Sequence, residues 1–185
     1  MLILGSQSPR RQELLKGLDI PFEVKTIDGI EEVFPPHLKR EEIPLYLSQL
    51  KANAYLDLID EDTIVITADT IVWCEDQLLE KPKDKTQAKQ MLRFLSGKTH
   101  SVYTGVTLLS KQKSKSFFAE SKVTFSDLSD EEINYYVEKY NPIDKAGAYG
   151  VQEWIGYIAV KKIEGSYYNV MGLPIQLLYN ELKTF

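Results

Sequence analysis

The chain has 185 residues, of which 43% are hydrophobic and 26% are charged. This length allows one domain that buries roughly 70% of the surface of its unfolded chain, and the composition excludes disordered, collagenous and coiled-coil proteins. The formal net charge of -5 argues against a protein whose main task is to coat nucleic acid or an anionic membrane, because both need a basic surface.

The single cysteine, Cys74, excludes an internal disulfide and a zinc ribbon, so a reducing cytoplasm is the expected compartment. The N-terminus lacks the basic region of a signal peptide. The longest apolar stretch, Ile64 to Cys74, is interrupted by Asp69. We therefore expect neither a signal peptide nor a membrane span.

The first 40 residues predict a strand, a loop, a helix, a second strand and a surface loop. Met1 to Leu4 is a short apolar run typical of a buried strand. Ser8 can cap a helix whose first position suits Pro9. Phe22 to Ile27 alternates as a strand does, and Glu31 to Lys39 has the prolines and charges of a surface loop.

The middle of the chain predicts two helices, a central strand and a hairpin. Leucines at helical spacing indicate a long amphipathic helix over Glu41 to Leu58, including an inward Leu58, and Lys85 to Leu95 predicts a second helix. Thr63 to Cys74 is β-branched and too apolar for an edge strand. Ser101 to Leu109 and Ser116 to Phe125 form the arms of the hairpin.

The last part predicts a helix from Ser129 to about Tyr140, a glycine-rich segment, a strand near Ile155 to Ile163 and a final helix after Pro174. No repeat or linker interrupts this pattern. The whole chain, 1–185, is therefore expected to be a single domain of mixed α/β type.

The standard signatures for cofactor and metal binding are absent, including the P-loop, GxGxxG, HExxH and the EF-hand loop. The two histidines, His37 and His100, are too few and too far apart for a metal site built from imidazoles. We expect them to be structural or exposed.

Residues Ser6 to Arg11 read S-Q-S-P-R-R and place two guanidinium groups and free backbone N–H groups at the start of a helix, where an anion is favoured. The alternative is an N-capped surface helix with solvated arginines. This motif alone does not decide between the two.

Asp69 is a carboxylate within an otherwise apolar strand, where unpaired burial is costly. It is either a metal ligand or general base in a cleft, or a residue satisfied by a salt bridge or a loop. Lys51 and Lys81 are candidate functional residues only if they lie close to Asp69 and the arginines; otherwise they are surface charges. Glu31 and Glu32 serve the site or merely add surface charge.

Seven motifs occur in the order in which the Maf family has them, along the whole chain, and together they closely resemble that family. They are S-Q-S-P-R-R (6–11), A-D-T-I-V (68–72), E-K-P (80–82), M-L-R-F-L-S-G-K-T-H (91–100), T-G-V (104–106), D-K-A-G-A-Y-G-V-Q (144–152) and G-S-Y-Y-N-V-M-G-L-P (165–174). The resemblance implies an α/β fold like that of inosine triphosphate pyrophosphatases, with an elongated, curved mixed sheet flanked by helices and two lobes around a central cleft.

The resemblance also implies a nucleoside triphosphate pyrophosphatase, which cuts between the α and β phosphates with a divalent metal, Mg²⁺ or Mn²⁺. By motif, Asp69 corresponds to the proton acceptor, and Glu32 helps Asp69 to hold the metal. The expected phosphate contacts are Arg10, Lys51 and Lys81, with Ser6 in the same loop. The chain is one residue longer than expected before Glu32, so Glu31 is the alternative.

The A-D-T and A-Y-G-V-Q motifs resemble the subfamily that acts on dTTP and UTP, in which Arg11, Thr70 and Gln152 correspond to the specificity residues. The amide of Gln152 can donate and accept at once, which suits a pyrimidine edge. A homodimer is also implied. The alternatives are a regulatory protein of septum formation or division arrest, and a housecleaning pyrophosphatase with broad base preference.

Overall fold

The computed structural model describes residues 1–185 and divides them into two compact units. Unit 1 comprises Met1–Thr70, Thr104–Ala119 and Gly172–Phe185, and unit 2 comprises Ile71–Tyr103 and Glu120–Met171. Each unit is therefore assembled from segments that are distant in the sequence. None of the helices has the length and apolar character that crossing a membrane requires.

Unit 1 contains five strands or parts of strands in the order β2-β1-β3-β5-β6. Their bounds are β1 (Leu2–Leu4), β2 (Glu23–Val24), β3 (Ile64–Cys74), β5 (Thr99–Leu109) and β6 (Ser114–Phe125). Strand β1 pairs in parallel with β2 on one side and β3 on the other. The last three strands also supply residues to unit 2, because the boundary between the units falls within them.

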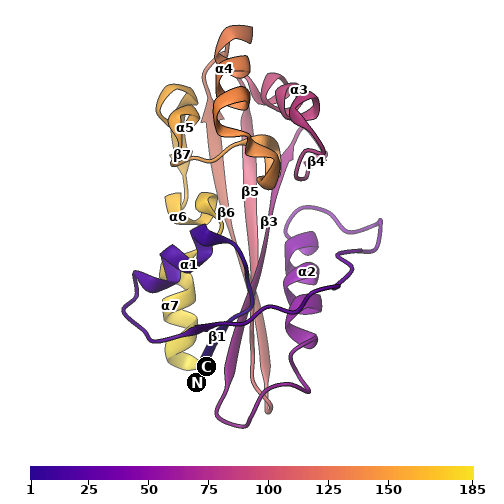
Figure 1. Cartoon of the computed structure of the whole chain (residues 1–185), viewed down its shortest axis with the longest axis vertical. Helices are drawn as coiled ribbons and strands as arrows, with labels where there is room; N and C mark the ends of the chain where they lie inside the picture. The colour runs from indigo at the N-terminus through magenta and orange to yellow at the C-terminus, as the bar shows by residue number, and fades with distance from the viewer. The chain divides into compact units, whose positions relative to one another are not determined.

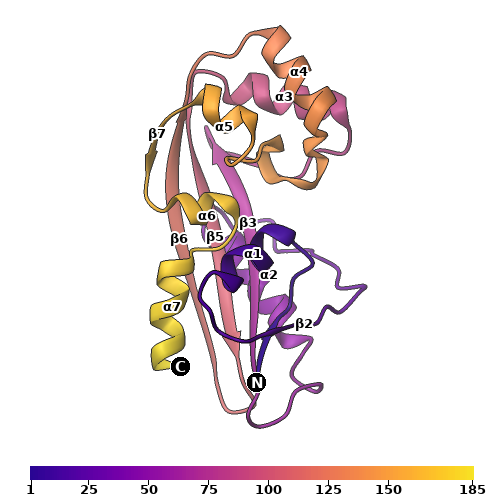
Figure 2. The ribbon, with the colours of Figure 1, turned by 60° about the vertical axis from the view of Figure 1, so that its left-hand side comes forward.

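Three helices belong to unit 1, namely α1 (Pro9–Lys16), α2 (Glu42–Asn53) and α7 (Ile175–Thr184). The connections from β1 to β2 and from β2 to β3 step in opposite directions across the parallel strands. Because such crossovers are right-handed, α1 and α2 must lie on opposite faces. Figures 1 and 2 show α2 on one side of these strands and α1 and α7 on the other.

Helix α2 lies close against β5 because residue 105 is glycine. A Cβ atom at Gly105 would come within 2.3 Å of the carbonyl carbon of Pro44. Hydroxyl groups add polar contacts: Ser48 Oγ lies 2.9 Å from Thr107 Oγ1, and Thr67 donates to the Ser48 carbonyl at 2.7 Å. These contacts fix the depth of the helix that carries Lys51.

Unit 2 contains strands in the order β4-β3-β5-β6-β7, with β4 (Gln77–Leu79) and β7 (Val160–Glu164) antiparallel to their neighbours. Its helical elements are α3 (Lys85–Leu95), α4 (Asp130–Tyr140), η1 (Pro142–Asp144), η2 (Ala146–Ala148), α5 (Trp154–Ala159) and α6 (Tyr167–Met171). Helices α3 and α4 lie side by side (Figure 2). A capping box at Ser129 and Glu132 begins α4.

Each unit has its own apolar cluster. In unit 1 it contains Ile3, Ala52, Tyr55, Ile59, Val65 and Leu109. In unit 2 it is larger and joins side chains of α3, α4, β3 and β6, with Leu92, Leu95, Phe125, Ile133 and Tyr136 among its most buried members.

The predicted mixed α/β fold is confirmed, since the sheet contains both parallel and antiparallel pairs flanked by helices. The central position of Thr63 to Cys74 is also confirmed, because β3 has neighbours on both sides. The two lobes, the elongated shape, the cleft and the single domain remain predictions.

Three predicted elements differ from the structure. The strand expected over Ile155 to Ile163 is a helix as far as Ala159, and only β7 is extended. Of Phe22 to Ile27 only Glu23–Val24 is a strand. The helix expected to reach Leu58 ends at Asn53, and Leu58 is 66% exposed, so its predicted inward position is wrong.

His100 provides a test of the core of unit 2. It is 2% exposed, its Nε2 lies 2.7 Å from Tyr149 Oη, and its ring meets Phe125 edge to face. Burial lowers the pKa of His100 to about 4. As the pH falls below 6.5, His100 becomes protonated in the unfolded chain but stays neutral in the folded chain until about pH 4. The folded state therefore loses stability relative to the unfolded state.

We therefore expect His100→Gln to reduce the loss of stability between pH 7.5 and pH 4, by up to about 3 kcal/mol. Urea unfolding of the wild type and the variant across this range measures the difference. His37→Gln is the matched control, because His37 is exposed and is the other histidine of the chain. Identical pH dependence in wild type and His100→Gln would contradict the assignment.

Candidate active site

The candidate active site in unit 1 begins at the loop between β1 and α1. The Gly5 N–H donates to the Ile66 carbonyl at 2.8 Å, which ties the loop to β3. Ser8 caps α1 by accepting from the Arg11 N–H, and the Ser8 N–H donates to Ser6 Oγ at 3.3 Å. The predicted N-cap and Pro9 are both confirmed, and they turn Arg11 toward β3.

Arg11 donates to four oxygen atoms that carry no full charge. Its Nε lies 2.8 Å from the Gly172 carbonyl, Nη1 lies 2.9 Å from the Ala68 carbonyl and 3.4 Å from Ser6 Oγ, and Nη2 lies 3.1 Å from Thr70 Oγ1. Burial lowers the pKa of Arg11, and the like charge of Arg10 acts in the same direction. An arginine stays protonated at neutral pH. Because all four acceptors of Arg11 are neutral oxygens, no direct partner cancels its positive charge.

Lys51, on α2, holds two carboxylates together. Its Nζ lies 2.7 Å from Asp69 Oδ1 and 3.0 Å from Glu32 Oε2. The Lys51 and Asp69 side chains are 14% and 13% exposed, whereas that of Glu32 is 49% exposed. The pair Lys51–Asp69 is thus nearly buried, and Glu32 approaches it from the solvent side.

Burial raises the pKa of Asp69, and the Lys51 ammonium and Arg11 oppose that rise. A carboxylate of raised pKa is a stronger base than an exposed aspartate, and the nearby cations favour its ionised form. The two interpretations of Asp69 from the sequence, a functional carboxylate and a residue satisfied by a salt bridge, are therefore compatible. Asp69 is satisfied by a salt bridge, and its raised pKa suits a general base.

The structure brings together Ser6, Arg11, Glu32, Lys51, Asp69 and Thr70, all within unit 1. Arg10 lies near enough to affect the titration of Arg11. Of the two glutamates it is Glu32 that pairs with Lys51; the carboxylate of Glu31 forms no ion pair.

Lys81 and Gln152 belong to unit 2. Lys81 follows β4, is exposed, and its ammonium forms no ion pair. Gln152 lies in the segment after η2, and its Oε1 is buried with no hydrogen-bond partner. A buried acceptor without a donor is costly, so this oxygen is suited to receive a hydrogen bond from a ligand.

Two residues of the site were not among the candidates. The Gly172 carbonyl accepts from Arg11, and Thr104 Oγ1 lies 2.9 Å from Thr70 Oγ1. Gly172 has a φ of +120°, which disfavours any other residue there. Both residues lie in quoted motifs, T-G-V and G-S-Y-Y-N-V-M-G-L-P, but carry no chemistry that a sequence pattern reveals.

Glu32 and Asp69 are the two carboxylates of the cluster that could hold a metal ion. No group of three or more His, Cys, Asp or Glu side chains converges in the structure. Glu32 and Asp69 already share one cationic group, the Lys51 ammonium. Hard carboxylate oxygens of this number fit Mg²⁺, which proteins commonly bind through one or two carboxylates together with substrate phosphates.

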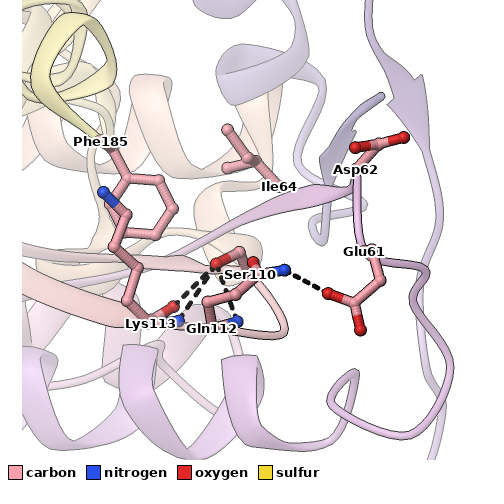
Figure 3. Close-up of a pocket in the computed structure, with 7 residues that line it drawn as sticks. All are labelled: Glu61, Asp62, Ile64, Ser110, Gln112, Lys113 and Phe185. Atoms are coloured by element: carbon pink, nitrogen blue, oxygen red, sulfur yellow. Dashed lines mark hydrogen bonds between the residues drawn. The ribbon is translucent and has the colours of Figure 1, made fainter.

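A pocket lies elsewhere in unit 1. It is lined by Glu61, Asp62, Ile64, Ser110, Gln112, Lys113 and Phe185 (Figure 3). Lys113 Nζ lies 4.5 Å from the centre of the Phe185 ring, and Gln112 donates to Glu61. None of the candidate residues lines this pocket, so the cluster around Lys51 is the better candidate.

Comparison with known proteins gives the family. The model of the Maf family, described as Maf-like protein, matches residues 1–185. A protein of Porphyromonas gingivalis named dTTP/UTP pyrophosphatase is 56% identical over 186 residues, covering 100% of this chain and 94% of that protein. One of the same name from Phocaeicola vulgatus is 58% identical over 182 residues, covering 98% of this chain and 94% of that protein.

A solved structure of the Staphylococcus aureus Ham1 protein matches the chain with a TM-score of 0.57 and 16% identity, covering 99% of this chain and 98% of that one. This likeness concerns the fold alone and supports the predicted α/β architecture. The family model spans every residue, and the relatives exceed half identity over nearly their whole length. The chain belongs to the Maf family.

Proposed function

We propose that the chain is a nucleoside triphosphate pyrophosphatase that converts dTTP and UTP to the monophosphate and pyrophosphate. The observation that carries this proposal is the buried Lys51–Asp69 pair beside Arg11, which supplies both cations for phosphate and a carboxylate base. The names and high identity of the relatives supply the substrate class.

Asp69 is proposed as the proton acceptor that activates the attacking water. Its carboxylate lies on β3, a mostly buried strand with neighbours on both sides, so the base is held in one place. A positioned base in a partly dry site is more effective than one in solution. Glu32 and Asp69 are proposed to hold a divalent metal, Mg²⁺ or Mn²⁺, which would neutralise phosphate charge when bound.

Different residues are proposed to contact different parts of the substrate. Arg10, Lys51 and Lys81 contact phosphates, with Ser6 in the same loop. Arg11 and Thr70 are proposed to set specificity, with Arg11 acting through its hydrogen bonds to Ser6, Thr70 and Gly172. Gln152 is proposed to read the base edge with its unpartnered oxygen.

A homodimer in the cytoplasm is proposed on the family likeness and on the intracellular supply of nucleoside triphosphates. The one cysteine, Cys74, is free and buried, which agrees with a reducing compartment. Light scattering after gel filtration of the purified chain would measure the mass. A monomer at micromolar concentration would contradict the dimer and leave the proposed activity standing.

The activity is tested with the purified chain, Mg²⁺ or Mn²⁺, and a panel of canonical and modified nucleoside triphosphates. Chromatography of the products identifies the bond that is cut. We expect dTMP and UMP with pyrophosphate, and a requirement for added metal that chelation removes. Initial release of orthophosphate with a diphosphate would overturn the proposal, and equal rates on all bases would favour the housecleaning alternative.

Asp69→Asn should keep the fold and lose roughly 10² to 10⁴ in kcat, because the amide cannot accept the proton from water. Asp57→Asn is the control, since Asp57 is an exposed carboxylate of the same unit that forms no ion pair. The measurement is pyrophosphate release from dTTP. A near wild-type rate for Asp69→Asn would assign the base to another group, with Glu32 next.

Gln152→Leu should lower kcat/KM for dTTP and UTP about tenfold or more, because the base loses a matched partner that is worth about 1 to 3 kcal/mol. Residual activity on purine nucleotides should fall less. Gln90→Leu, at an exposed glutamine of unit 2, is the control. An equal loss on every nucleotide would show that Gln152 shapes the loop or the phosphate site instead.

A further inference from the structure

Residues 144 to 153 of unit 2 form a backbone segment of unusual shape. Gly147 has a φ of +68°, and its N–H donates to the Glu80 carbonyl at 3.2 Å. The next residue, Ala148, has a φ of +61°, which is uncommon for a residue with a Cβ atom. Such a backbone keeps its shape only if the surrounding residues hold it.

Buried side chains do hold this segment. Tyr136, a fully buried residue of α4, accepts a hydrogen bond from the Gly150 N–H at 3.0 Å and donates its own hydroxyl proton to Glu153 Oε2. One phenol group therefore contacts the backbone two residues before Gln152 and the side chain one residue after it.

Lys145 completes the network. It is 8% exposed, and its Nζ lies 2.8 Å from Asp144 Oδ1 and 3.3 Å from Glu153 Oε1. The two oxygens of Glu153 are thus taken by different donors, the Tyr136 hydroxyl and the Lys145 ammonium. A Cβ atom at Gly150 would lie 3.0 Å from both the Lys145 and Glu153 side chains, so the backbone lies directly on this pair.

Gln152 lies in the sequence between Gly150 and Glu153, the two residues that Tyr136 contacts. Tyr136, Lys145 and Glu153 have hydrogen-bond or ion-pair partners, whereas the buried Oε1 of Gln152 has none. The side-chain donors of the network, the Tyr136 hydroxyl and the Lys145 ammonium, are taken by Glu153 and Asp144, and the Gln152 oxygen is left without a donor. This arrangement suits an acceptor that must be kept in one position for a donor on a ligand.

We propose that Tyr136 is a positioning residue for Gln152 and, through it, for recognition of the pyrimidine base. Glu153 and Lys145 complete the support that Tyr136 begins. This inference rests on the proposed function, because it takes Gln152 to contact the base. It assigns no contact with the reacting phosphate to Tyr136.

The test compares Tyr136→Phe with Tyr140→Phe. The ring of Tyr140 stacks on that of Tyr136 at 5.2 Å, so both variants remove a hydroxyl from the same aromatic pair, and only one of them faces Gly150 and Glu153. Steady-state kinetics on dTTP and dATP, with thermal unfolding of each variant, supply the readouts.

We expect Tyr136→Phe to raise KM for dTTP about tenfold, with kcat changed much less and the KM for dATP unchanged. Tyr140→Phe should match the wild type. An unchanged KM for dTTP, or an equal rise for both nucleotides, would overturn the inference. Failure of the wild type to hydrolyse dTTP would instead overturn the proposed function.

A second pair of variants decides the matter if Tyr136→Phe does not fold. Glu153→Leu removes the acceptor that Tyr136 and Lys145 share, whereas Glu153→Gln keeps an acceptor of the same shape. We expect the leucine variant to raise KM for dTTP and the glutamine variant to restore most of the wild-type value. Equal KM values for the two variants would overturn the inference.

Discussion

The ion pair between Lys51 and Asp69 is the interaction on which the site in unit 1 depends. A carboxylate on a strand as buried as β3 cannot remain ionised without a cation, and Lys51 Nζ supplies it at 2.7 Å. Lys51 reaches Asp69 only because α2 lies close to the strands. That closeness follows from Gly105 and from the hydroxyl contacts of Ser48 with Thr67 and Thr107.

The same pair explains how charges are distributed in an acidic protein that is proposed to bind a polyanion. Lys51 is shared between two carboxylates, whereas Arg11 donates only to neutral oxygens and keeps its full charge. The carboxylates are proposed to hold a metal and Arg10 to contact phosphate, while the uncancelled charge of Arg11 adds to the positive potential of the site. A net charge of -5 over the chain is therefore compatible with a locally cationic site.

Local signals in the sequence predicted the elements that local chemistry controls. Ser8 and Pro9 begin α1, and the run of β-branched residues around Asp69 forms a central strand. The strand expected near Ile155 failed because the same apolar residues suit a short helix. In that helix Gly156 permits a close approach: a Cβ there would lie 1.7 Å from the Val151 carbonyl oxygen. Periodicity cannot report such a contact.

The spacing of residues along the sequence could not predict that the site residues lie close together. Lys51 and Asp69 are 18 residues apart on different elements, and Arg11 meets Gly172 from 161 residues away. The resemblance to the Maf family supplied Arg11, Lys51 and Asp69 together, and the structure adds what they contact, including the Gly172 carbonyl. The networks around Arg11 and Gln152 have no sequence signal, because carbonyl groups and glycines form much of them.

Hydrolysis of dTTP by Lys51→Met tests whether the site depends on the ion pair between Lys51 and Asp69. Lys25→Met is the control, at an exposed lysine of the same unit. We expect Lys51→Met to keep its circular dichroism spectrum and to lose roughly 10² or more in kcat/KM, since it removes the cation that holds Asp69 and is proposed to contact phosphate. The Lys25 control should match the wild type. A folded Lys51→Met protein that hydrolyses dTTP at the wild-type rate would show that the site does not depend on the Lys51–Asp69 pair.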